Sequence, residues 1–574
     1  MTEQEILFWG ILLGSTIPLC CFLLYAVRVS FDVKTIDEFF LAKRAMSGRS
    51  LAMTLGASWF SIGNVTLSLI IMGFFFGWMN IWTAFTWFIG FLILFAHAKR
   101  IRTMCDESGE LSINSFLKKR LSRLTGYAAA TLIIIIAISL LALELIVAMS
   151  VFSLVTPAPE GDIFGLIIGL AMAVVITLYA TMGGLTAVVK TDVWQFYLIL
   201  ISLACILIGM FVWSMGPDMS DEIAHSVRFQ YDIVSTFDNL FGGPWLFADS
   251  GVWMFVLGLV CLQFFLIVGD MGSWQRILAV DAEQARASRN TWSSIWIVGV
   301  VSALAWAIIA GAGMMFSPVF NESLQAENIG GFAAYDSLFV RDIISTIAGI
   351  THPVLTWFLA GSLVLLIVAG LMAAMLSTSD SYLLVALQSL SSDILEKHRQ
   401  SDRLAEDVDY ESGRRGTPGD KYRPCPTDTA SVSFSRRWMW ACSTMAFMLA
   451  VVILAMGWGF LEIALLVLGS QVAIAPVAVL AMRQDIDVSR YGREATVALI
   501  SGASLAFAFG FFSMLKLDPN VHPYTGFVPP IIALGVSYMV LTLALLLKDG
   551  PRASLMMFAC MFGVYGFRKG HSND

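Results

Sequence analysis

The sequence predicts an all-α polytopic membrane protein, and three observations carry this prediction. Of its 574 residues, 58% are hydrophobic and only 13% are charged, whereas about a quarter of the residues in soluble proteins are charged. The mean hydropathy is +0.78. Apolar runs long enough to cross about 30 Å of hydrocarbon recur along the chain. No stretch indicates a folded soluble domain, so the function is expected in the membrane part.

The apolar runs predict about 13 transmembrane helices, because a helix needs about 20 residues to span a bilayer. They lie at 6–28, 50–77, 79–98, 124–154, 162–182, 191–214, 251–270, 291–316, 353–395, 437–456, 459–482, 495–515 and 525–547. The run 554–567 is too short to span and predicts an interfacial helix. The first run follows no basic residue and can span as it stands, so we expect a permanent helix rather than a signal peptide. The eight cysteines show neither a disulfide pattern nor metal-ligand spacing.

Basic residues predict the orientation. With the N-terminus outside, only Arg228, Arg341 and Lys516 of the 35 lysines and arginines fall in outer loops. This bias predicts an outer N-terminus and a cytoplasmic C-terminus in the cell (inner) membrane. The segments 215–250 and 317–352 are expected to be partly helical caps over the outer mouth. The charged segment 398–437 is expected to be a flexible cytoplasmic loop.

Helices two to eleven divide into two groups of five, and each group begins with an interrupted helix. The helix 50–77 contains GASWFSIGN, and the helix 251–270 ends in GDMG. The third helix of each group is long. Groups of five helices have opposite topologies, so the pattern predicts a 5+5 inverted repeat with solute and ion near the bilayer midplane. The expected parts are an extra helix (1–30), two repeats (31–215 and 216–482), two further helices (483–550) and a tail (551–574).

The run 369–395 is apolar except for five consecutive polar side chains, which are Ser377, Thr378, Ser379, Asp380 and Ser381. On a helix, Ser377 and Ser381 share a face and can offer oxygens to a small hard cation. Alternatively, the hydroxyls bond to carbonyls one turn earlier and only tune packing. Because an ionisable group inside a membrane is functional by default, we favour an ion-binding helix.

Three motifs resemble a known family. They read YATMGGLTAVVKTDVWQ (179–195), QRILAVDAEQARAS (275–288) and AAMLSTSDSYLL (373–384). Together they closely resemble the sodium:solute symporter family, over residues 30–550. The resemblance implies the leucine-transporter type of fold and a shared sodium site between the interrupted first core helix and the eighth. The matching ligands are the carbonyls of Ala57, Phe60 and Ala374 and the hydroxyls of Ser377 and Thr378. Such neutral oxygens suit sodium, so sodium rather than a proton is the expected coupling ion. For Ala57 and Phe60 the alternative is a helix that is merely kinked.

The resemblance also implies a second sodium site in some members, whose matching positions are Asp192, Asp380 and Ser381. Asp380 departs from those members, which have a serine there. Asp192 has an alternative role as cap and dipole partner of the helix 191–214. Gly183 and Gly184 are expected to form a tight turn. Gln275 and Arg276, together with Asp270, are expected where the sixth core helix reaches the cytoplasm, as an ion-paired end that helps to close an inner gate.

The family fold implies a solute cavity among the first, third, sixth, eighth and tenth core helices. Its candidate lining residues are Trp59, Asn64, Glu144, Gln263 and Gln471, although each amide can equally bridge helices. No arginine or lysine is predicted in the middle of any span, so a carboxylate solute would depend on helix N-termini and sodium for countercharge. Glu144 must be protonated or paired. If it faces the cavity, it favours a solute with an ammonium group or several hydroxyls.

The leading hypothesis is a secondary active transporter that imports a small organic solute with sodium by alternating access. Its expected partners are the solute, sodium and the lipid bilayer, and no nucleic acid. An enzyme is not expected, because the spans contain no convincing nucleophile, base or metal set. The alternative is a membrane sensor that keeps the transporter fold and signals solute occupancy through 398–437. The sequence leaves the oligomeric state open.

Overall fold

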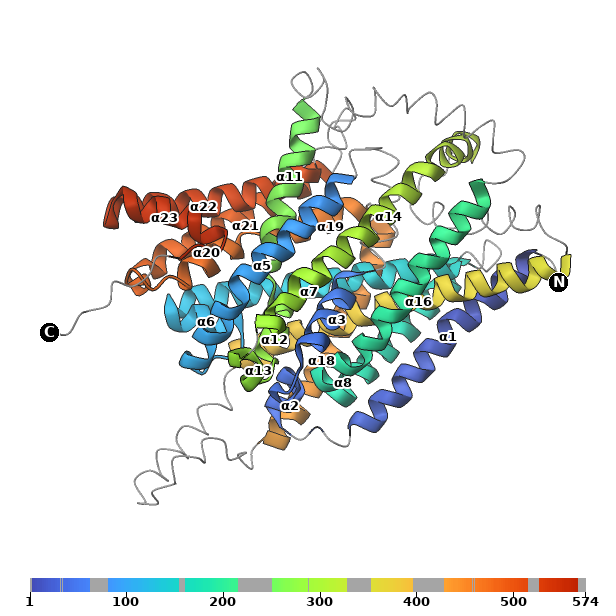
Figure 1. Ribbon diagram of the computed structural model, residues 1–574, viewed down its shortest axis with the longest axis horizontal. Helices are drawn as coiled ribbons and strands as arrows, with labels where there is room; N and C mark the ends of the chain where they lie inside the picture. Colours follow the sequence, from blue (N-terminus) through green and yellow to red (C-terminus); the bar gives the residue numbers. More distant parts are fainter. Residues whose placement is uncertain are drawn as a thin grey trace.

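The structure is a computed structural model, and it describes residues 3–30, 33, 35–61, 81–153, 161–214, 250–287, 289–327, 353–395, 428–456, 458, 460–514 and 526–565. Its elements are almost entirely helical (Figure 1). The helices are α1 (Glu3–Ser30), α2 (Ile36–Leu41), α3 (Gly48–Trp59), α5 (Ile81–Ser108), α6 (Ile113–Arg120), α7 (Arg123–Ser153), α8 (Gly161–Ser214), α11 (Ser250–Leu266), α12 (Met271–Leu278), α13 (Ala282–Ala287), α14 (Arg289–Glu327), α16 (Pro353–Gln388), α18 (Asp428–Met456), α19 (Phe460–Gln471), α20 (Ile474–Ala481), α21 (Gly492–Met514), α22 (Val528–Asp549) and α23 (Pro551–Met561).

The described residues contain 10 helices long and apolar enough to cross a membrane, or up to 11 if the bent pair α11 and α12 forms one span. The predicted count of 13 is therefore not confirmed. One of the 10, Gly165–Ile208, covers two predicted helices, because the chain is helical on both sides of a kink at Gly184, where φ is 52°. The predicted helix 50–77 lies outside the described residues beyond Ser61.

The chain leaves α-helical geometry at the two places where the sequence predicts interruptions. Helix α3 ends at Trp59, and Phe60 leaves helical geometry with φ −90° and ψ 80°. Helix α11 passes through a short 3₁₀ turn to Asp270, where α12 starts at an angle of 41°. Each break frees backbone groups that a continuous helix would use internally.

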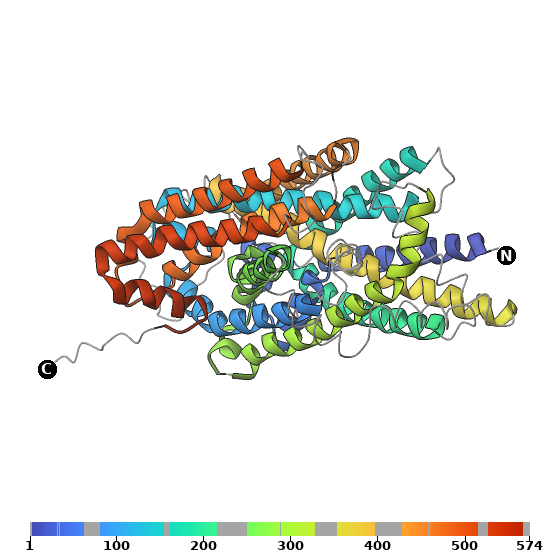
Figure 2. The same cartoon turned by 90° about the horizontal axis from the view of Figure 1, so that it is seen from above.

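Helix α16 lies at the centre of the packing. It contacts α8, α1 and α7 over long stretches, and α3 and α12 over shorter ones. Helices α5 and α14 also pack side by side. Helices α22 and α23 lie at the opposite end of the molecule from α1 in both views (Figures 1 and 2). The central position of α16 places its polar run next to both interrupted helices.

Three boundaries differ from the prediction. Helix α18 begins at Asp428, so the last part of the predicted loop 398–437 is helical, and its residues 398–427 lie outside the described part. The second half of α8 is already helical after Gly184, so Asp192 lies inside a helix rather than at its start. Helix α23 begins at Pro551, a few residues before the predicted 554–567.

The predicted outer caps lie mostly outside the described residues. This holds for most of 215–250 and 317–352, although α14 extends to Glu327.

Candidate functional site

The break in α3 meets the polar run of α16. The hydroxyl of Thr378 lies 3.4 Å from the carbonyl oxygen of Phe60 and donates to the carbonyl of Ala374 at 2.8 Å. Ala57 lies one turn before Phe60, and Ser377 precedes Thr378; all five residues are buried. The structure thus brings the two predicted ligand segments into contact. Their carbonyl and hydroxyl oxygens form a donor set that fits a hard monovalent cation.

Asp192 on α8 connects this place to a charged cluster. Its Oδ1 accepts a hydrogen bond from Ser377 at 2.7 Å, and its Oδ2 accepts one from Thr54. The same Oδ2 lies 3.4 Å from Nη2 of Arg276. Both partners of this ion pair are at most 1% exposed. Asp192 is therefore shared between a predicted sodium ligand and a buried guanidinium.

Arg276 lies in the last turn of α12, after the predicted span 251–270, and it is only 1% exposed. Its Nε donates to Thr54 at 3.0 Å, its Nη1 to the carbonyl of Gly272 at 3.2 Å, and its Nη2 to Ser381 at 2.7 Å. It also interacts electrostatically with Asp380. The physical reason is the break before α12, which turns this short helix into the bundle, where all of its residues are buried. The guanidinium thus contacts Asp192 and Ser381, two of the three positions matched to a second sodium site.

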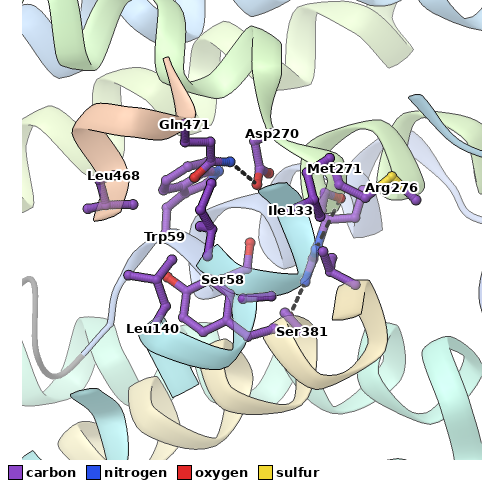
Figure 3. A pocket seen from close by; sticks show the side chains of 15 residues that line it. Ser58, Trp59, Ile133, Leu140, Asp270, Met271, Arg276, Ser381, Leu468 and Gln471 are labelled. Atoms are coloured by element: carbon purple, nitrogen blue, oxygen red, sulfur yellow. Dashed lines mark hydrogen bonds between the residues drawn. The ribbon is translucent and has the colours of Figure 1, made fainter. Parts of the chain in front are cut away.

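A small cavity lies beside this cluster, at the level of both helix breaks (Figure 3). Its volume is about 30 Å³, which is room for roughly two water molecules. Aliphatic side chains of α7 form one wall, and Trp59 and Gln471 reach it from α3 and α19. Asp270 and Arg276 bring charged groups to the other wall. Ser381 and Tyr382 line it from α16.

The other candidate solute residues lie elsewhere. Gln263 on α11 accepts a hydrogen bond from Thr86 on α5 and does not line the cavity. Glu144 on α7 accepts one from Ser61, just after the break in α3, and it also does not line the cavity. Asn64 lies outside the described residues. Of the five candidates, the cavity therefore includes Trp59 and Gln471.

A second polar network joins α12, α16 and α6. Gln275 donates to Gln388, which in turn donates to the carbonyl of Leu111 at 2.9 Å. The carboxylate of Asp393 accepts hydrogen bonds from Ser112 and Asn114, both at 2.8 Å. This network ties the far end of α16 to α6 and α12.

Sequence reasoning missed two features of the site. Thr54, one turn before Ala57, joins Arg276 to Asp192. Asp270 is expected from the sequence at a cytoplasmic helix end, but it lines the cavity. The available signal is its place in GDMG, since a carboxylate directly at a helix break near the midplane is positioned for ligand contact.

Membrane transporters typically have interrupted helices next to a central cavity, with buried oxygen atoms of the kind that bind cations. The sequence model of the sodium:solute symporter family matches residues 39–410, more than half of the chain. The chain belongs to this family, so the predicted family is confirmed. Membership supports sodium-coupled solute transport as the class of activity, with sodium as the coupling ion, and a location in a membrane.

Solved structures support the fold. A Na⁺-coupled sialic acid symporter in a substrate-bound outward-open state is similar with a TM-score of 0.64 at 16% identity, covering 94% of this chain and 97% of that chain. MhsT in complex with L-phenylalanine has a TM-score of 0.41 at 15% identity, covering 90% and 98%. A manganese transporter of Eremococcus coleocola has a TM-score of 0.43 at 11% identity, covering 90% and 92%. No curated protein matches the chain. The similarity to the sialic acid symporter and the membrane-spanning helices confirm the predicted all-α polytopic fold.

Proposed function

We propose that this protein is a sodium-driven importer of a small organic solute that works by alternating access. The observation that carries the proposal is the contact between the α3 break and Thr378 on α16. A helix break supplies carbonyls, and the neighbouring helix supplies hydroxyls, so a cation can bind without any carboxylate in direct contact. The proposed sodium ligands are the oxygens of Ala57, Phe60, Ala374, Ser377 and Thr378.

The buried charges support one sodium ion per cycle. The cluster of Asp192, Asp380 and Arg276 carries two carboxylates and one guanidinium, all buried. One bound sodium next to Ser377 would balance the remaining negative charge, because Ser377 donates to Asp192. A second sodium at Asp192 and Ser381 would have to displace Arg276, which already contacts both. The guanidinium thus takes the place of the second ion.

The inward movement requires a gate on the cytoplasmic side. In the proposed orientation, with the N-terminus outside in the cell membrane, the Gln275–Gln388 bond and the Asp393 network lie on the cytoplasmic side of the cavity. These contacts are hydrogen bonds between helices and can exchange for water when the bundle rocks. Sodium and solute bound above them would be released once they part.

The driving force is sufficient. Moving one sodium ion inward across about 100 mV releases about 2.3 kcal/mol, and a tenfold solute gradient costs about 1.4 kcal/mol. One ion therefore supports more than a tenfold gradient from voltage alone.

Uptake by the purified full-length protein in liposomes tests the proposal. An inward sodium gradient with an inside-negative potential should drive accumulation of solutes from a metabolite mixture, detected by mass spectrometry. Replacing sodium by potassium, or collapsing the gradient with a sodium ionophore, should stop the accumulation. Accumulation that persists without sodium would contradict sodium coupling. Solute binding without any transport would favour the sensor.

A further inference from the structure

The cavity contains a carboxylate whose second oxygen is nearly unused. Oδ2 of Asp270 caps α12 by accepting from the backbone N–H of Ser273 at 2.6 Å and from its hydroxyl at 2.8 Å. Oδ1 accepts from Nε2 of Gln471, at the long distance of 3.4 Å. Figure 3 shows Gln471 and Asp270 facing each other across the top of the cavity. The carboxylate also interacts with the backbone N–H of Gly272. The cap of α12 explains these backbone contacts, whereas the side-chain donor to Oδ1 is the distant Gln471 amide.

Arg276 lines the same cavity and acts on Asp270 electrostatically, but it forms its ion pair with Asp192. Its hydrogen bonds go to Thr54, Gly272, Ser381 and Asp192. Among the residues that the structure describes, no lysine, arginine or histidine forms an ion pair with Asp270. Asp270 is half-buried and faces a mostly apolar cavity, so a positively charged partner would stabilise its carboxylate.

The surroundings of Oδ1 favour an organic cation over a bare metal ion. The ring of Trp59 lies beside the cavity, held edge-to-face against Trp87 at 5.2 Å. The wall opposite consists of Ile133, Ile136, Ala137 and Leu140. Sodium needs several oxygens around it, whereas an ammonium group attached to carbon pairs with one carboxylate, an aromatic face and aliphatic contacts.

We propose that Asp270 is the specificity-determining residue of the solute site and that the transported solute carries a protonated amine, which donates to Asp270 Oδ1. This inference rests on the proposed function, since it names the chemistry of the solute that the symporter carries. The Gln471 amide would shift to a second polar group of the solute. The cavity widens to admit the solute, because its present volume holds only water.

Arg276 excludes the opposite charge type. A solute that presented only a carboxylate would meet, on one wall of the cavity, Asp270 and a guanidinium already engaged by Asp192 and Ser381. It would have to break these bonds and would bring a further negative charge close to Asp192, Asp270 and Asp380. Amines and zwitterions with an amine fit this pattern, and simple anions do not.

The test uses proteoliposomes under a sodium gradient with pairs of solutes that differ by an amine in place of a hydroxyl, namely L-alanine with L-lactate, ethanolamine with ethylene glycol, and glucosamine with glucose. The same vesicles are also given a whole-cell metabolite extract, and the accumulated compounds are identified by mass spectrometry. We expect every sodium-dependent accumulated solute to contain a basic nitrogen. Accumulation of solutes without one would overturn the inference but leave the symporter intact. If nothing accumulates, the proposed function fails, and the inference fails with it.

Asp270→Asn is the matching variant. Asparagine caps helices as well as aspartate does, so α12 keeps its N-terminus while the charge is lost. Uptake of the amine should fall at least about tenfold, mainly through a higher KM. Asp281→Asn is the control, because Asp281 caps the neighbouring α13 through the N–H groups of Glu283 and Gln284 and lies outside the cavity. Uptake of the same amine by Asp270→Asn at the rate of Asp281→Asn would refute the role of Asp270.

Discussion

Helix α16 presents two polar regions to its neighbours, and they differ in how charge is held. Around Thr378 the oxygens are neutral, coming from hydroxyls and from the carbonyls of Phe60 and Ala374. One turn further, at Asp380 and Ser381, the partners are charged, and Arg276 lies among them. The first region suits a cation that binds reversibly, and the second contains a permanent cation, the guanidinium of Arg276.

The contrast shows how the two regions can be coupled. Asp192 contacts Ser377 with one oxygen and Thr54 and Arg276 with the other. A sodium ion that draws on the Ser377 oxygen changes the hydrogen bond to Asp192 and therefore the field at Arg276. Arg276 also borders the solute cavity. Arg276 thus contacts groups of both the proposed sodium site and the proposed solute site.

Removing the fixed cation should have the largest effect. Arg276→Gln leaves Asp192 and Asp380 buried without their guanidinium, so the free energy of unfolding should fall by about 3–5 kcal/mol and uptake should be abolished. Arg276→Lys should not restore uptake, because one ammonium does not reach Thr54, Ser381 and Asp192 in the same geometry. Thermal unfolding in detergent measures the loss of stability, and liposome assays measure the loss of uptake.

A double variant tests the origin of this loss. In Arg276→Gln combined with Asp192→Asn, part of the lost stability should return, since the unpaired charge of Asp192 is gone.

The single variant Arg276→Lys has its own contradicting outcome. If it had the melting temperature and the uptake of the wild type, the charge alone would matter and the several hydrogen bonds of the guanidinium would not.

Substitutions in the neutral region should change the sodium dependence of uptake and leave the stability of the protein unchanged. Ser377→Ala and Thr378→Ala each remove one proposed ligand and little volume, so each should raise the sodium concentration for half-maximal uptake roughly tenfold. The protein should remain folded. Ser379→Ala removes a buried hydroxyl of the same helix that is not a proposed ligand, and it should leave the sodium dependence unchanged. An unchanged sodium half-saturation in the double variant would rule out this site.

The sequence predicted the neutral region better than the charged one, for a physical reason. The resemblance to the family matches the segments around Ala57 and Ser377 to one site, and the structure brings these segments into contact at Phe60 and Thr378. Arg276 and Asp270 depend on the angle of 41° at the α11–α12 break. Hydropathy ends the predicted helix at Asp270 and gives no information on the contacts that Asp270 and Arg276 form after the break. The bridging role of Thr54 depends on three helices and has no sequence signal.

Glu144 offers a smaller test of the same contrast, between a carboxylate at the cavity and one away from it. It is 2% exposed and accepts a hydrogen bond from Ser61. Glu144→Gln keeps its shape and its acceptor oxygen, so uptake should change less than about threefold, compared with tenfold or more for Asp270→Asn. The profile of uptake from mildly acidic to mildly alkaline pH should match the wild type. A loss as large as that of Asp270→Asn would place the solute charge at Glu144.

The smallest effect is expected far from both regions, in the segment that separates α16 from α18. Because α18 begins at Asp428, a deletion of 401–425 removes only chain outside the described helices and preserves the start of that helix. Polar chain rich in charge, glycine and proline contributes no core, so sodium-driven uptake should remain at the wild-type rate. Uptake and a cellular response to the solute are measured on the same variant. Loss of uptake would show that the segment supports the transport cycle, whereas retained uptake with a lost response would establish signalling through this segment in addition to transport.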